Sequence, residues 1–349
     1  MVHHRCRYLR ELIAIIVLVL LIAGLLIRDF ISQNEKIIGV YFYPWYSPDG
    51  RHWDPSVDPS WAVVEQPLIG FYDSRDEQVI RWQLKLIRDA GIDFIAISWW
   101  GPGSFEDEAA KIIVRYLREY NLKFAVLIEP YLGSNNSSLY DKGFWESSLR
   151  YIMENFIEPY GNAYMYLHGK PLVLAFNPLG LMYRPHEDFP EFTIRIVGND
   201  IDNAGYQDWD YWPDYLYRSE RVELRIRRDS VVSVVPRFCD THFRAQGMCI
   251  DPDLTHGFYR KQWDWVLRNA DKVSIVMITS WNEYHERTQI EPSFSNQTAD
   301  PWFLYNTTKE YIALLKKRSM SNVALSIVAS VIVVLISVMV IKLKLNRNE

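Results

Sequence analysis

The stretch VSIVMITSWNEYHERTQIE, residues 273–291, decides how the rest of the chain is interpreted. Its first part, residues 273–277, is a short apolar run that predicts a buried strand. Two carboxylates, Glu283 and Glu286, then follow in a short turn beside Trp281 and Tyr284. Flat aromatic rings stack on sugar faces, and carboxylates exchange protons or stabilise positive charge at an anomeric carbon. The stretch therefore predicts a buried strand leading into a site suited to sugar cleavage.

Working outward, the middle of the chain repeats one pattern, a short apolar segment followed by an amphipathic or polar one. We predict strands at residues 37–46, 93–100, 123–129, 171–176, 192–197, 206–212, 230–236 and 273–280. We predict helices from a cap at residues 74–76 to residue 90, and at residues 105–120, 144–156, 256–270 and 301–317. Eight strands alternating with helices predict a (β/α)8 TIM barrel, an α/β fold. A doubly wound sheet is the alternative, but no glycine-rich phosphate loop follows the first strand.

Polar and aromatic residues gather where the predicted strands end, whereas the strand interiors consist of Ile, Val, Phe and Ala. In a (β/α)8 barrel the chemistry lies at the C-terminal ends of the strands. The residues at these ends are Tyr43, Trp45, Tyr46, Ser98, Trp99, Trp100, Glu129, Tyr131, Asn177, Asn199, Asp200, Trp209, Tyr211, Arg237, Asn282, Glu283 and Glu286. The pattern predicts a functional site on that face of the barrel.

The composition narrows the class of protein. Aromatic residues make up 15 % of the chain, with 13 Trp and 22 Tyr, which suits either a large core or a carbohydrate groove. The net charge of −5 argues against nucleic-acid binding. Of three cysteines, Cys239 and Cys249 are close enough in sequence to form a disulfide in an extracytoplasmic loop, and two free thiols are the alternative.

Both ends of the chain are apolar and predict membrane spans. Residues 12–27 carry no charge and follow three arginines, and no small-x-small cleavage site follows them, so we expect an uncleaved anchor rather than a signal peptide. Residues 323–341 are long enough to span a bilayer and precede Lys342 and Lys344. Positive charge outside both spans places both termini in the cytoplasm and the middle of the chain outside it. Four glycosylation sequons, starting at Asn135, Asn136, Asn296 and Asn306, agree with that orientation.

We therefore expect three regions. Residues 1–32 form a cytoplasmic N-terminus and transmembrane anchor, residues 33–318 form the barrel domain, and residues 319–349 form a second transmembrane helix with a short cytoplasmic tail. The expected partners are membrane lipid and a glycan.

The glutamates carry the main chemical hypothesis. Glu283 and Glu286 are three apart, so in a turn they point to the same side and suit an acid and base pair; the alternative is one capping and one solvated glutamate. Glu129 ends an apolar strand, where an ionised carboxylate needs a partner. That partner is either an arginine, such as Arg75 or Arg237, or sugar hydroxyls.

Other chemistries find little support. His285 belongs to the site or packs beside it, and the remaining histidines lack ligand spacing, so no metal or other cofactor is expected. Ser280 is not part of a Gly-x-Ser-x-Gly elbow, which argues against a serine hydrolase.

The segment WNEYHERTQIE, residues 281–291, resembles the signature of glycoside hydrolase family 99, the endo-α-mannosidases. Further pieces match in the same order: YPWY at 43–46, HW at 52–53, Tyr72, SRD at 74–76, AISWW at 96–100 and IEPY at 128–131. The resemblance covers most of residues 39–316 and leaves out the two apolar ends.

The resemblance implies a (β/α)8 barrel that cleaves internal α-mannosidic bonds with retention and without a metal. It implies a 1,2-anhydro-sugar intermediate, with Glu283 as base on the sugar 2-hydroxyl and Glu286 as acid/base. Glu129, Trp99 and Tyr46 match residues that line the sugar site. The rest of the predicted substrate-binding set is Asn282, Tyr131, Trp45 and His285.

The chain departs from the family pattern at two positions in the signature. Arg287 stands in place of glycine, and a cation there is expected to lower the pKa of the acid/base or to contact the substrate. Tyr284 replaces tryptophan and adds a hydroxyl. Residues 199–249 match poorly, which leaves substrate identity open. A glycan-remodelling transglycosylase and a non-catalytic carbohydrate-binding membrane protein are the alternatives to a hydrolase.

Overall fold

The structure is a computed structural model that describes only part of the 349 residues. The described residues are 24, 35–54, 56–57, 63–131, 141–177, 184–198, 207–212, 222, 224–251, 253–295 and 299–319. The chain divides into two compact units, one of residues 37–314 and one that combines residues 1–36 with 315–349. The fold and the site below belong to the first unit.

Both predicted membrane spans, residues 12–27 and 323–341, lie outside the described residues, apart from Gly24. Within the described ranges, no helix combines the length and the apolar character needed to cross a bilayer.

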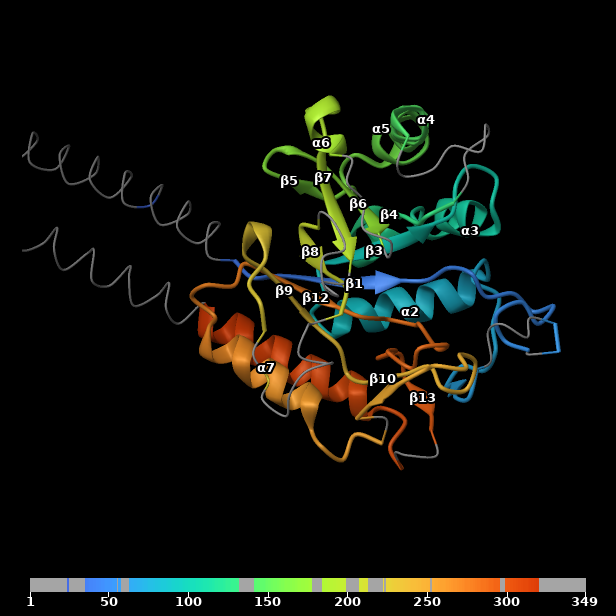
Figure 1. The fold of residues 1–349 in the computed structure, drawn as a ribbon, viewed down its shortest axis with the longest axis vertical. Coiled ribbons are helices and arrows are strands. Elements are labelled where there is room, and N and C mark those ends of the chain that lie inside the picture. Colours follow the sequence, from blue (N-terminus) through green and yellow to red (C-terminus); the bar gives the residue numbers. More distant parts are fainter. Residues whose placement is uncertain are drawn as a thin grey trace, which may run out of the picture. The chain divides into compact units, whose positions relative to one another are not determined.

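Eight parallel strands form the centre of the first unit (Figure 1). They are β1 (Ile37–Phe42), β3 (Phe94–Trp99), β4 (Lys123–Ile128), β6 (Lys170–Asn177), β7 (Thr193–Gly198), β8 (Trp209–Asp210), β9 (Val231–Val234) and β12 (Ile275–Ile278). Their order in the sheet is β8-β7-β6-β4-β3-β1-β12-β9. The two ends of this sheet meet, because the Ser233 hydroxyl of β9 donates to the Asp210 carbonyl of β8. This nearly closed barrel confirms the predicted (β/α)8 fold and the position of all eight strands.

The barrel interior is apolar because the strands are built from β-branched and aromatic residues. Val40 of β1 pairs with Ile95 of β3 on one side and with Ile278 of β12 on the other. All three side chains are buried. This packing fixes β1 and β12 side by side, although more than 230 residues separate them in sequence.

Helices surround the strands (Figure 1). They are α2 (Glu77–Asp89), α3 (Phe105–Ile113), α4 (Lys142–Ile152), α5 (Glu158–Tyr160), α6 (Pro185–Asp188), α7 (Phe258–Arg268) and, within this unit, the helical residues 303–314. The predicted helix 105–120 is divided: after α3, the Arg115 and Tyr116 amides donate to carbonyls three residues back, and a 3₁₀ turn, Leu117–Tyr120, follows. A π-helical turn, Met153–Ile157, joins α4 to α5.

Asp76 begins α2, as the sequence predicts. Its carboxylate accepts from the Gln78 amide at 2.7 Å and the Val79 amide at 3.5 Å. We expect Asp76→Ala to lower the free energy of unfolding by about 1 kcal/mol, since two amides lose their acceptor, and Asp76→Asn to cost less. Urea unfolding of the full chain measures both. Equal losses for Ala and Asn would contradict a capping role.

Several short strands form antiparallel pairs in addition to the eight barrel strands. The strands β5 (Tyr166–Leu167) and β6 pair antiparallel, as do β2 (Gln66–Pro67) with β13 (Ser293–Phe294), and β10 (Phe238–Cys239) with β11 (Cys249–Ile250). A disulfide joins Cys239 to Cys249 across the β10–β11 hairpin, which settles the choice that the sequence left open.

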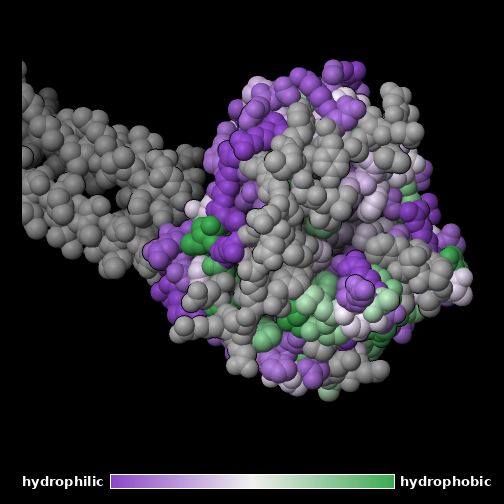
Figure 2. All heavy atoms as spheres, in the orientation of Figure 1, coloured by the Kyte–Doolittle hydropathy of each residue, from purple (hydrophilic) through white to green (hydrophobic). Residues whose placement is uncertain are grey.

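The described surface carries both hydrophilic and hydrophobic residues. Figure 2 shows hydrophilic residues over much of the described surface and hydrophobic residues gathered in its lower part. Near the β2–β13 pair, Val64, Phe71 and Phe294 are each at least half exposed.

Candidate active site

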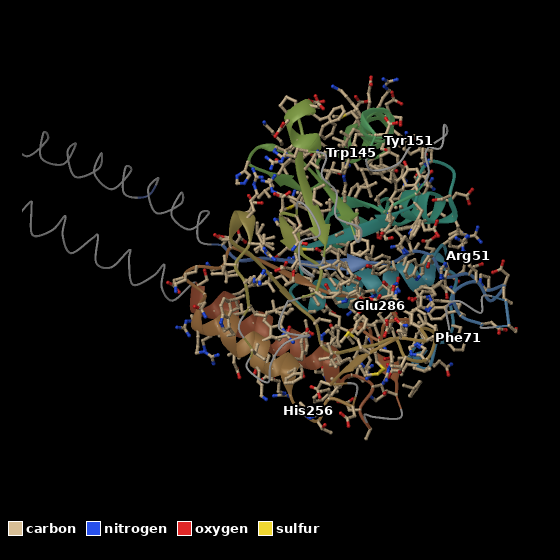
Figure 3. The ribbon with its side chains drawn as sticks, viewed as in Figure 1. Arg51, Phe71, Trp145, Tyr151, His256 and Glu286 are labelled. Atoms are coloured by element: carbon tan, nitrogen blue, oxygen red, sulfur yellow. A yellow bond between two sulfur atoms is a disulfide. The ribbon has the colours of Figure 1, made fainter. Side chains whose placement is uncertain are left out.

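A cavity of about 330 Å³ opens at the C-terminal ends of the barrel strands. It contains three carboxylates, Glu129, Glu283 and Glu286, and one guanidinium, Arg244. The remaining lining residues are Tyr43, Trp45, Trp100, Pro130, Phe176, Tyr211 and Trp212. Apart from Arg244, which lies between residues 239 and 249, the lining residues follow β1, β3, β4, β8 and β12 or lie near the end of β6, so the cavity lies on the face where the sequence predicts a site. Figure 3 places Glu286 near the middle of the molecule.

The turn after β12 is held by its own side chains. The Ser280 hydroxyl accepts from the Glu283 amide at 2.8 Å. The Glu283 Oε1 atom then accepts from the His285 amide at 2.8 Å and the Glu286 amide at 3.3 Å. Glu283 is therefore fixed in place by two backbone donors, which favour its ionised form.

Asn282 fastens this turn to the end of β1. Its Oδ1 accepts from the Tyr43 amide at 2.8 Å and its Nδ2 donates to the Tyr43 carbonyl at 2.9 Å. The Tyr46 hydroxyl donates to the Asn282 carbonyl at 2.7 Å, and the Tyr46 ring stacks on Trp53. Asn282 and Tyr46 are fully buried and do not line the cavity, so their contacts hold the turn in position.

The hydroxyl that Tyr284 adds to the signature has a partner. It donates to Oε2 of Glu291 at 2.8 Å, and the same oxygen accepts from the Tyr72 hydroxyl at 3.0 Å. Gln83 of α2 donates to the other oxygen of Glu291 at 2.7 Å. Burial raises the pKa of Glu291 to about 7. This cluster supports the turn from behind and lies outside the cavity.

The two glutamates of the turn are buried and influence each other. Glu283 is 3 % exposed and Glu286 is 7 % exposed. Burial raises the pKa of Glu286 to about 7, while Arg244 opposes that rise. Burial first, and the charge of Glu286 second, raise the pKa of Glu283 well above its ordinary value. The two carboxyls therefore titrate as an interacting pair, which is an arrangement suited to acid/base chemistry.

Glu129 directly follows β4 and lines the same cavity. Its Oε1 accepts from the Ser98 hydroxyl at 2.8 Å, and burial raises its pKa to about 8. The arginines considered as its partner lie elsewhere: Arg75 bonds to Asp73, and Arg237 pairs with Glu65. A largely protonated carboxyl at neutral pH can both donate to and accept from sugar hydroxyls.

Trp99 and Tyr131, like Asn282 and Tyr46, belong to the predicted substrate-binding set but do not line the cavity. The Trp99 indole lies on the other side of β3, where its Nε1 donates to Asp107 at 2.9 Å and its ring stacks on Tyr151. Tyr131 packs edge-on against Trp99 and shares a hydrogen bond with Ser148 at 2.9 Å. Successive side chains along a strand point to opposite faces. Because Ser98 points toward Glu129, the adjacent Trp99 points to the other face of β3.

Trp45 lines the cavity, and its ring stacks on His52 with centroids 4.8 Å apart. His285 lies behind it, with Nε2 at 3.2 Å from Nδ1 of His52. Burial and then the nearby Arg51 charge lower the pKa of His52 to about 3, so that ring is neutral. This packed pair supports Trp45 and the turn.

Several lining residues were not selected from the sequence. The sequence pattern puts Tyr43, Trp100 and Tyr211 at strand ends without indicating a role for them, and it does not single out Phe176, Trp212 or Arg244. The Tyr43 and Tyr211 hydroxyls share a hydrogen bond across the cavity floor. These residues come together only when the barrel closes. The sequence therefore indicates no more than that several of them follow predicted strands.

Arg287 does not act where the sequence analysis expected. Its backbone has φ of 58°, a conformation that favours glycine, which explains glycine in the family pattern. Its guanidinium turns from the cavity and donates to Glu65 at 2.8 Å. The cation beside Glu286 is Arg244, at 3.3 Å. The expectation that Arg287 lowers the pKa of the acid/base is wrong, because Arg244 is the cation that opposes the raised pKa of Glu286. A contact between Arg287 and the substrate stays a prediction.

Among the described residues, one group has spacing suited to a metal: Asp251, Asp253 and His256. Asp251 already accepts from the amides of His256 and Phe258 at the start of α7. None of the three lines the cavity, so no role in its chemistry follows.

Comparisons with known proteins agree with this geometry. The model of glycosyl hydrolase family 99 matches residues 45–184. The glycoprotein endo-alpha-1,2-mannosidase of Mus musculus is 25 % identical, over 82 % of this chain and 72 % of that protein. The glycoprotein endo-alpha-1,2-mannosidase-like protein of Homo sapiens is 23 % identical, over 76 % of this chain and 70 % of that protein.

A solved structure shares the fold. The GH99 endo-alpha-mannosidase from Bacteroides thetaiotaomicron superposes with a TM-score of 0.63 at 18 % identity, over 83 % of this chain and 99 % of that one. The family match over residues 45–184, the relatives and the carboxylate-lined cavity at the ends of the barrel strands support glycoside hydrolase family 99 as the family that this chain resembles.

Proposed function

We propose that this glycoside hydrolase is a membrane-tethered, retaining endo-α-mannosidase that cleaves internal α-mannosidic bonds in glycans. The observation that carries the proposal is the cavity shared by Glu129, Glu283 and Glu286. The name of the Mus musculus relative, glycoprotein endo-alpha-1,2-mannosidase, supports the substrate class.

In the first step, the Glu283 carboxylate takes the proton of the 2-hydroxyl of the reacting sugar. The freed oxygen attacks the anomeric carbon as the glycosidic bond breaks, which gives a 1,2-anhydro sugar. Protonated Glu286 gives its proton to the leaving oxygen. Positioned acids and bases of this kind contribute roughly 10²–10⁴-fold each to the rate.

In the second step, Glu286, now a carboxylate, takes a proton from water. The water oxygen attacks the anomeric carbon and breaks its bond to the 2-oxygen, which recovers its proton from Glu283. Two successive inversions return the original anomeric configuration. Each carboxyl ends the cycle in the protonation state in which it began.

The contacts of the pair support these roles. The first step needs ionised Glu283, and the amides of His285 and Glu286 both donate to it. The second step needs ionised Glu286, and Arg244 donates to it at 3.3 Å. The site therefore contains a stabilising partner for each of the two ionised forms.

Recognition of the sugar falls to the rest of the cavity. Glu129 suits hydroxyl binding because it is buried, lines the cavity and, among the described side chains, accepts a hydrogen bond from Ser98 at one of its two oxygens. Trp45 and Trp100 offer flat faces on which a sugar ring can stack.

Membrane tethering rests on the two apolar ends of the sequence. The Cys239–Cys249 disulfide supports an extracytoplasmic barrel, because disulfides persist in oxidising compartments. We therefore place the catalytic domain at the cell surface or in the secretory lumen, with both termini in the cytoplasm.

Turnover of an α-mannosyl oligosaccharide by the full chain tests the proposal. We expect the wild type to release an oligosaccharide with retained anomeric configuration, and Glu286→Gln to lose at least about 10²-fold in kcat/KM, since it cannot supply the proton. Nuclear magnetic resonance of the first-formed product reports the configuration.

Glu146→Gln is the matched control, because Glu146 is an exposed glutamate of α4 that pairs with Arg150 and does not line the cavity. No turnover by the wild type would overturn the hydrolase assignment, and full activity of Glu286→Gln would overturn its role. Transfer of the sugar to an added acceptor in preference to water would favour a transglycosylase.

A further inference from the structure

The β10–β11 hairpin is attached directly to the catalytic turn. The Cys239 amide donates to the Glu286 carbonyl at 2.8 Å, and the Cys239–Cys249 disulfide closes the loop that follows. Within that loop, the Asp240 carboxylate accepts from the Met248 amide at 2.7 Å. The loop is therefore fixed at its base beside Glu286.

Arg244 projects from this loop to the cavity wall. One guanidinium nitrogen donates to Asp240 at 2.7 Å and another donates to Glu286 at 3.3 Å. The guanidinium also lies over the Phe243 ring, 4.9 Å from its centroid. The side chain is 45 % exposed, whereas the side chains of Asp240 and Glu286 are almost fully buried. Arg244 is thus anchored by Asp240 through one guanidinium nitrogen and donates to the acid/base from another.

We propose that Arg244, held by Asp240 and the disulfide-closed hairpin, is a positioning residue that stabilises the carboxylate form of Glu286 during the second step. The inference rests on the proposed acid/base role of Glu286. It assigns a function to a segment that matches the family pattern poorly and that the sequence analysis left without one.

The charges around Glu286 support this role. Burial raises the pKa of Glu286, Arg244 lowers it, and Asp240 raises it. The other titratable groups that interact with this carboxyl come from the turn itself, from β4 and from the end of β8: Glu283, Glu129 and Tyr211. Each of these is an acid, so Arg244 is the cation in this set. Without it, Glu286 holds its proton to a higher pH and yields less base for attack by water.

The protonation of Glu286 can be followed directly, without turnover. Its carboxyl stretching band in the infrared spectrum is identified by its loss in Glu286→Gln and is titrated in the full chain. We expect Arg244→Gln to move the midpoint upward by at least about one pH unit, because an adjacent opposite charge shifts a carboxyl by that amount or more. Arg244→Lys keeps the charge and is expected to shift the midpoint less.

The kinetics give a second readout. In Arg244→Gln, the alkaline limb of kcat/KM for an α-mannosyl oligosaccharide moves to higher pH, since the acid form of Glu286 persists longer. Arg260→Gln, on the exposed face of α7, is the control and leaves both the midpoint and the limb in place.

If the midpoint of the Glu286 titration is unchanged in Arg244→Gln, the inference is overturned. It is also overturned if Arg244→Lys shifts that midpoint as much as Arg244→Gln does, because the shape of the side chain and not its charge would then be responsible. A uniform loss of activity at every pH, without movement of the limb, also contradicts it. None of these outcomes affects the hydrolase assignment, which fails separately if the wild type does not cleave the glycan.

Discussion

Glu283→Gln is expected to lower kcat/KM on an α-mannosyl oligosaccharide by roughly 10²–10⁴-fold, and a better leaving group is not expected to restore it. The amide cannot take the proton of the sugar 2-hydroxyl, so the attacking oxygen is never formed. Gln keeps the size of the side chain and an oxygen that accepts from the His285 and Glu286 amides. The loss therefore reports the missing base and not a collapsed turn.

The matched comparison is Glu286→Gln. With a substrate whose leaving group needs no proton, such as an α-mannosyl fluoride, the first step proceeds without an acid. We expect Glu286→Gln to recover much of its first-step rate on that substrate, while Glu283→Gln stays inactive. Equal rescue of both variants would show that the two roles are assigned wrongly.

A substrate that lacks the 2-hydroxyl on the reacting sugar separates the two possible retaining routes. In the anhydro-sugar route the missing hydroxyl is the nucleophile, so no turnover is expected. If Glu283 instead attacked the anomeric carbon, the same substrate would react and leave a glycosyl ester on Glu283. Mass spectrometry of the denatured protein measures that adduct.

Most of the barrel could be predicted from the sequence because each strand carries its own signal. A strand of a parallel sheet is buried on both of its faces, so it consists of a short continuous apolar run such as that of β1 or β12. The glutamates of the catalytic turn could be found for the same reason, since Glu283 and Glu286 follow a strand within a few residues.

Side-chain direction and distant pairing could not be predicted. Trp99 and Trp100 are adjacent, and only the register of β3 decides that Trp100 faces the cavity while Trp99 bonds to Asp107. Arg244 reaches Glu286 across 42 residues, through a hairpin whose disulfide the sequence left open. In a segment that matches the family pattern poorly, the neighbouring sequence does not indicate which distant residue a charged side chain will contact.

The Glu65 cluster is the second case of distant pairing, and it carries the largest expected effect on stability. The Glu65 carboxylate accepts from Arg287 at 2.8 Å and from Ser295 at 2.8 Å, and also from Arg237 and Gln289. The side chains of Glu65 and Arg237 are each 1 % exposed. Arg237 in turn donates to the Arg287 carbonyl at 3.0 Å, so the cluster holds the far end of the catalytic turn.

Glu65→Ala is expected to lower the free energy of unfolding by about 3–5 kcal/mol, because two buried guanidiniums lose their shared carboxylate. Glu65→Gln retains the shape and one acceptor, so it is expected to cost less. Urea unfolding of the full chain at neutral pH measures both. Glu77→Ala, which removes a solvent-exposed partner of Arg81, is the control and should leave the unfolding midpoint nearly unchanged.

The pH dependence shows whether the charge of Glu65 is responsible. Burial alone would raise its pKa, but Arg237 and Arg287 lower it below its ordinary value. A lowered pKa in the folded state means that the stabilisation is complete above the pKa of the unfolded chain, about 4.3, and is lost as the pH falls through the folded value. The stability difference between wild type and Glu65→Gln should therefore shrink on acidification below about pH 4. A difference that stays constant with pH would assign the cost to hydrogen bonding and packing, because neither depends on the charge of this carboxylate.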